Sequence, residues 1–86
     1  MSLQIALNII EEYQALTGQE GAHIDKLCLA IRCRFIRSKQ LTEQDKITLK
    51  EKALCLLAYE IHFCKTTFNF EALELMIKLE ELVLRK

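Results

Sequence analysis

Apolar and polar residues alternate along this chain with the period of an α-helix in four successive segments. Within each segment the apolar residues recur at spacings of three and four, which places them on one side of a helix. The pattern predicts helices over about 2–16, 22–38, 43–64 and 70–86. No segment has the strict alternation of a strand, so we expect an all-α fold.

The links between these segments are short and carry signals for helix ends. Gly18 follows the first segment and suits the left-handed residue that ends a helix. Thr42 and Asp45 match a capping pattern that starts a helix, and Thr67 or Asn69 can cap the last segment. Short links join antiparallel helices. The sequence therefore predicts a small four-helix bundle or a pair of helical hairpins.

The last segment is apolar over most of its circumference, whereas a surface helix usually has a single apolar stripe. Glu80 divides its apolar positions into two halves. One half is expected in the chain's own core: Ala72, Leu75, Met76, Leu79, Leu82 and Val83. The other half is predicted to form a dimer interface, with the reverse assignment left open: Phe70, Leu73, Ile77 and Leu84.

The chain has more apolar material than one small core can hide. Apolar residues make up 51% of its 86 residues, and a domain of this size buries only about 60–65% of the surface that its unfolded chain exposes. The segments 22–38 and 43–64 are also apolar on more than one side. Association with a second copy is the simplest remedy, so we expect a homodimer.

The formal net charge is zero, so no overall charge draws the protein to nucleic acid or to a membrane. Four basic residues nevertheless gather at the end of the second segment, and we predict that they bind a partner: Arg32, Arg34, Arg37 and Lys39. They could bind an acidic protein surface or, together with the third helix, DNA. Glu43 and Asp45 weaken the DNA interpretation, because they stand where a recognition helix would begin.

The four cysteines do not form a recognisable site. Cys28 and Cys33 are five residues apart, and Cys55 and Cys64 are nine apart, so neither pair can form a disulfide within its own helix. These spacings also differ from those of zinc sites. Cys55 and His62 lie about 10.5 Å apart along a helix, which is too far for a catalytic dyad. We expect no catalytic residue, no metal and no cofactor, and we interpret the cysteines as small buried residues.

The sequence has no run of about 18 apolar residues that could span a membrane. Its N-terminus lacks the features of a signal peptide, so we expect a cytoplasmic protein with reduced cysteines. No phosphate-binding loop, nucleophile elbow or metalloprotease motif is present. Our leading hypothesis is a helical interaction or regulatory protein without catalytic activity, which self-associates and binds a protein partner. The alternative is a dimeric DNA-binding transcriptional regulator that uses the basic flank of the second helix.

Overall fold

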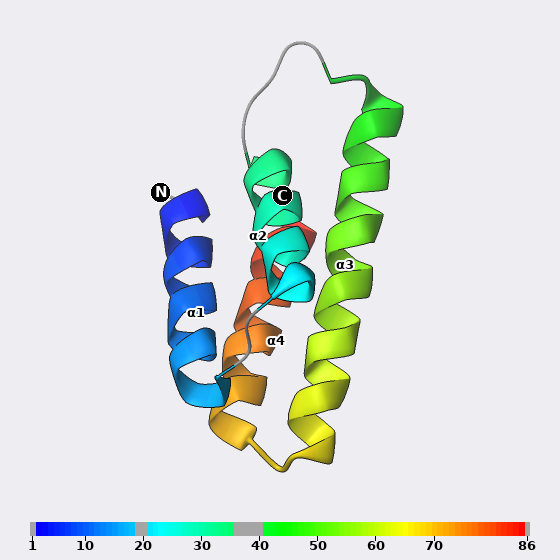
Figure 1. Cartoon of the computed structure of the whole chain (residues 1–86). Coiled ribbons are helices and arrows are strands. Elements are labelled where there is room, and N and C mark those ends of the chain that lie inside the picture. The colour runs from blue at the N-terminus through cyan, green and yellow to red at the C-terminus, as the bar shows by residue number, and fades with distance from the viewer. Residues whose placement is uncertain (1, 19–20, 36–40, 86) are drawn as a thin grey trace.

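The computed structural model describes residues 2–18, 21–35 and 41–85, which form four helices. These are α1 (Ser2–Thr17), α2 (Ala22–Phe35), α3 (Glu43–Thr66) and α4 (Phe70–Arg85). Each helix runs antiparallel to the next, and α1 closes the arrangement by packing against α4 (Figure 1). The predicted all-α fold is confirmed, and of the two expected architectures the chain forms the four-helix bundle.

The predicted and observed helix ends differ slightly. α3 continues two residues past position 64, since the backbone N–H of Thr67 still donates to the carbonyl of Phe63, 3.0 Å away. Phe68 then reverses the chain with a left-handed φ of 57°, which is uncommon for a residue other than glycine. Residues 36–38 of the second predicted helix, and residue 86 of the last, lie outside the described residues.

Side-chain caps fix where α3 and α4 begin. The Thr42 hydroxyl accepts the backbone N–H of Asp45 at 3.1 Å, and the Asp45 carboxylate accepts the backbone N–H of Thr42 at 3.2 Å. This reciprocal pair is the predicted capping box. Asn69 accepts the backbone N–H of Ala72 at 3.2 Å, so Asn69 caps α4. Gly18 has a φ of 70°, as predicted for the residue that ends α1.

One column of buried residues on each helix forms the core. Alternating steps of four and three, which are typical of helices packed side by side, separate the buried residues of α3 and α4. The columns are Ala6, Ile10 and Tyr13 on α1; Ile24, Leu27, Ala30, Ile31 and Phe35 on α2; Ala53, Leu57, Glu60 and Cys64 on α3; and Ala72, Met76, Leu79 and Val83 on α4. A fully buried leucine, isoleucine or methionine contributes about 1.5–3 kcal/mol.

α3 is the longest helix, and its first turns extend beyond the ends of its neighbours (Figure 1). As a result, no residue between 43 and 52 is buried. None of the helices in the described part of the chain combines the length and the apolar character needed to cross a bilayer.

Candidate functional site

A charged residue interrupts the apolar column of α3. Glu60 is only 1% exposed, and its Oε1 accepts a hydrogen bond of 2.5 Å from the hydroxyl of Tyr13 on α1. The thiol of Cys64, one turn further along α3, donates to the same tyrosine oxygen at 3.5 Å. The three side chains thus form a buried polar cluster that connects α1 to α3.

α2 joins this cluster through His23 in its first turn. The Nδ1 atom of His23 lies 2.8 Å from the other carboxylate oxygen of Glu60. The imidazole ring packs on the ring of Tyr59, with 4.2 Å between the two ring centroids. The two atoms are in close contact, but the direction of the Nδ1–H bond does not give a well-aligned hydrogen bond. Glu60 therefore connects three helices, with Tyr13 on one oxygen and His23 on the other.

Burial decides the chemistry of the cluster. Burial, followed by the hydrogen bond to Glu60, raises the pKa of Tyr13, so the phenol stays protonated and acts as a donor. The Cys64 thiol points to this phenol, and neither Cys64 nor Tyr13 is exposed. His23 is the one member with an exposed edge, its side chain being 36% exposed. The arrangement suits a structural tie between helices better than a site that a substrate enters.

The predicted dimer-interface residues of α4 lie outside the core. Phe70 is 63% exposed, Ile77 42% and Leu84 51%, while Leu73 is partly buried against the core. The half of α4 assigned to the core does lie there, with four residues fully buried and Leu75 and Leu82 partly buried. The half of α4 that was expected in the core therefore lies there. That the other half forms an interface with a second copy stays a prediction.

The flank of α3 that faces α4 follows from its contacts with α2. On α3, the residues that directly precede buried ones lie on the side of α2. Tyr59, which precedes Glu60, packs on His23 of α2. Lys52, which precedes Ala53, lines a groove between α3 and α2. The other neighbour of α3 is α4. Residues that directly follow the buried ones on α3 therefore face α4.

The matching flank of α4 follows from the antiparallel packing. In the α2–α3 pair both helices turn the same flank inward, since His23 and Lys26 on α2 also precede buried residues. α3 and α4 are likewise antiparallel and meet through the opposite flank of α3. α4 therefore turns toward α3 the residues that follow its own buried column, which include Leu73, Ile77 and Leu84.

The two flanks form a largely apolar surface along the outside of α3 and α4, which we name the hairpin face. Lys65 and Glu80, which also follow buried residues, interrupt it with charge. Positions seven residues apart run along both helices, a spacing that keeps side chains toward a common partner. Exposed apolar side chains gathered in this way are typical of interaction sites. The hairpin face consists of Ile47, Leu54, Ala58 and Ile61 from α3 and of Phe70, Leu73, Ile77 and Leu84 from α4.

The basic residues predicted to bind a partner do not form one surface in the described structure. Arg32 is exposed, whereas Arg34 is partly buried and its Nε atom is buried without a hydrogen-bond partner among the described residues. Because they are two residues apart on a helix, their side chains point in directions about 160° apart. Arg37 and Lys39 lie outside the described residues.

The cysteines are all free thiols: Cys55 is exposed, Cys28 and Cys33 are partly buried, and Cys64 is buried. Burial raises the pKa of Cys28, although nearby Arg32 acts in the opposite direction. In the described part of the chain, no three His, Cys, Asp or Glu side chains are grouped as metal ligands would be.

Glu60, the central residue of the buried cluster, was not predicted from the sequence. Its spacing in the sequence nevertheless places it in the buried column of α3, since Glu60 continues the steps of four and three residues that lead from Ala53 and Leu57 to Cys64. A carboxylate in such a column signals a buried polar contact. The tyrosine that satisfies it belongs to another helix, so the pairing required the fold.

These features define an up-and-down four-helix bundle with a buried polar cluster inside and an apolar hairpin face outside. No protein family, curated protein or solved structure matches the chain.

Proposed function

We propose that this protein is a helical interaction protein without catalytic activity, which pairs with a second copy through the hairpin face and binds a protein partner elsewhere on the bundle. The observation that carries this proposal is the exposure of Ile47, Phe70, Ile77 and Leu84 on one side of two adjacent helices. Burying these side chains against a second copy removes their apolar surface from water, at about 25 cal/mol per Å².

A symmetric pairing also matches the charges beside the hairpin face. Ala58 precedes the end of α3 by eight residues, and Ile77 follows the start of α4 by seven, so the two are about level along the hairpin. A two-fold axis that lies in the face at this level, across the two helices, lays α3 of one copy antiparallel over α3 of the other and α4 over α4, because such an interface uses the same surface twice.

Under this symmetry a lysine meets a glutamate. Lys65 lies seven residues from Ala58 toward the α3–α4 turn, about 10.5 Å along the helix. Glu51 lies seven residues from Ala58 in the other direction, also about 10.5 Å along α3, and both side chains are exposed. The axis brings Lys65 of one copy opposite Glu51 of the other, and the pair forms twice. Charge complementarity of this kind sets register and orientation.

The buried cluster supports a non-catalytic role. Tyr13, Glu60 and Cys64 are held in the core, where they hold α1 and α3 together. The alternative function, a dimeric DNA-binding regulator, has no specific support from the described residues, since Arg32 and Arg34 point away from each other.

Sedimentation equilibrium at micromolar concentration tests the proposal. We expect the wild-type protein to be dimeric and Ile77→Gln to weaken the dimer by about 1–3 kcal/mol, because Ile77 lies at the centre of the face. Lys78→Gln places the same side chain one position away, outside the hairpin face, and should leave the dimer intact. A wild-type protein that stays monomeric at hundreds of micromolar would contradict the proposal.

A further inference from the structure

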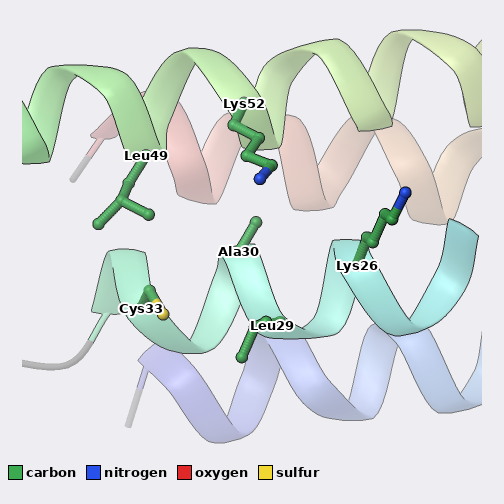
Figure 2. A pocket seen from close by; sticks show the side chains of 6 residues that line it. All are labelled: Lys26, Leu29, Ala30, Cys33, Leu49 and Lys52. Atoms are coloured by element: carbon green, nitrogen blue, oxygen red, sulfur yellow. The ribbon is translucent and has the colours of Figure 1, made fainter. Parts of the chain in front are cut away.

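A second surface lies on the other flank of α3, where α2 and α3 form a groove. Figure 2 shows that Leu49 and Lys52 project from α3 toward α2, while Ala30 projects from α2 toward α3. Leu29, Cys33 and Lys26 of α2 complete its lining. Because α3 uses its opposite flank for the hairpin face, both surfaces can be occupied at once.

The size of the groove indicates what it can take. It encloses a cavity of about 110 Å³. Sites for small molecules and cofactors usually measure about 300–1,000 Å³. A cavity of about 150 Å³ holds one benzene molecule, so this one holds a single branched apolar side chain. A protein segment that inserts one leucine-sized side chain fits this volume better than a metabolite does.

The lining of the groove combines an apolar floor with cationic edges. Ala30 and Leu49 supply the floor, and Leu29, which is 62% exposed, adds apolar surface at its edge. Lys26 and Lys52 stand on opposite walls, one on each helix, and both are exposed. Neither forms an ion pair with an acidic residue in the described part of the chain.

We propose that the groove binds an acidic amphipathic helix of a partner protein. An apolar side chain of that helix inserts between Ala30 and Leu49, and carboxylates on either side of it pair with Lys26 and Lys52. Helices commonly dock in this way, with the apolar face in a groove and charged residues at its rim. Carboxylates three or four positions from the inserted residue lie on the same side of the docking helix.

This inference supplies the partner site of the proposed function, but its geometry does not depend on the dimer. It uses other residues than the basic flank expected from the sequence, because Lys26 and Lys52 line this groove and Arg32 is not among its lining residues. The two lysines come from segments 26 residues apart, so only the packing of α2 on α3 brings them to one groove.

A designed peptide of about 18 residues tests the proposal by fluorescence anisotropy. It is an amphipathic helix with a central leucine and glutamates four positions before and three positions after it, and a second peptide carries lysines in place of these glutamates. We expect the glutamate peptide to bind and the lysine peptide not to bind. Lys26→Glu and Lys52→Glu should each weaken binding of the glutamate peptide about tenfold.

Two comparisons make the result specific. The double variant Lys26→Glu with Lys52→Glu should bind the lysine peptide instead, whereas Lys78→Glu, the same charge change on α4, should leave binding of the glutamate peptide unchanged. Equal binding of both peptides, or no effect of the groove substitutions, would overturn the proposal. The proposal would also be overturned if the glutamate peptide did not bind and the groove substitutions instead abolished binding of duplex DNA or of phosphatidylserine vesicles.

Failure of this proposal can be told apart from failure of the proposed dimer. The glutamate peptide should bind Ile77→Gln as tightly as wild type, because the hairpin face and the groove lie on different flanks of α3. A monomeric wild-type protein that still binds the peptide would contradict the dimer alone. A dimer that ignores the peptide would contradict the groove alone.

Discussion

The hydroxyl of Tyr13 and the carboxylate of Glu60 meet in the core through a hydrogen bond of 2.5 Å, although 47 residues separate them in the chain. The second carboxylate oxygen lies 2.8 Å from Nδ1 of His23. A buried carboxyl group is tolerated where its oxygens have partners. These contacts therefore join α1, α2 and α3 inside the core.

Replacing Tyr13 by phenylalanine should destabilise the fold. The ring still fills its place, but Glu60 loses the donor to one of its buried oxygens, and an unsatisfied buried group costs about 1–3 kcal/mol. Tyr59→Phe is the matched control, because that side chain is 59% exposed and its hydroxyl can bond to water. Urea denaturation of both variants measures the difference, and equal stabilities would show that the Tyr13 hydroxyl contributes nothing.

Alkaline pH should unfold the protein through the same residue. Burial and the hydrogen bond to Glu60 raise the pKa of Tyr13 in the folded state, whereas the phenol of the unfolded chain ionises near pH 10. Above about pH 10 the folded state thus holds one more proton, so this contribution to stability falls by about 1.4 kcal/mol per pH unit. It is fully present below that pH.

The pH dependence of unfolding in Tyr13→Phe isolates this contribution from other groups that titrate at high pH. The free energy of unfolding of this variant should decline less steeply above pH 10 than that of wild type. The difference between the two slopes should correspond to one proton. Denaturant titrations at several pH values between 8 and 11.5 give both slopes. Identical slopes would mean that Tyr13 ionises as readily in the folded protein as in the unfolded chain.

The sequence was sufficient for the elements of the fold because their signals are local. Helical periodicity, the capping box at Thr42 and the left-handed Gly18 each depend on a few neighbouring residues, and all three are present in the structure. Glu80 also marked the division of the apolar arc of α4 into two halves, but which half enters the core required the fold. Helix ends were less certain, because the turn of α3 depends on where Phe68 reverses the chain.

The candidate sites could not be derived in the same way, because each joins residues from different helices. Glu60 lies on a column shared with Leu57, but its partners come from α1 and α2. Lys26 and Lys52 are unremarkable on their own helices and become a pair only across the groove. A helical wheel shows which residues share a side of one helix and not which helix covers that side.

Thiol reactivity should follow burial. Cys55 is exposed, Cys28 is partly buried with its pKa raised by burial, and Cys64 is fully buried. The thiolate is the reactive form, so we expect alkylation of Cys55 first, then Cys28, and Cys64 only on unfolding. A short pulse of iodoacetamide followed by peptide mass spectrometry gives the order. Rapid modification of Cys64 without denaturant would contradict the described core.

The symmetric dimer makes a sharper prediction than self-association alone. If Lys65 of one copy meets Glu51 of the other, Lys65→Glu places two carboxylates together at both ends of the interface, and Glu51→Lys places two ammonium groups there. Each single variant should weaken the dimer, because facing like charges are unfavourable. The double variant should regain most of the wild-type affinity, since the swapped charges pair again.

Restoration by the double variant is the decisive observation, because neither change adds apolar contact. Within one copy the two residues are fourteen positions apart, about 21 Å along α3, so they have no pairing to restore there. Sedimentation equilibrium at low salt should show the recovery, and added salt should reduce the differences among the variants. If the double variant instead loses as much dimerisation free energy as the two single variants lose together, the two copies pair in another register or through another face.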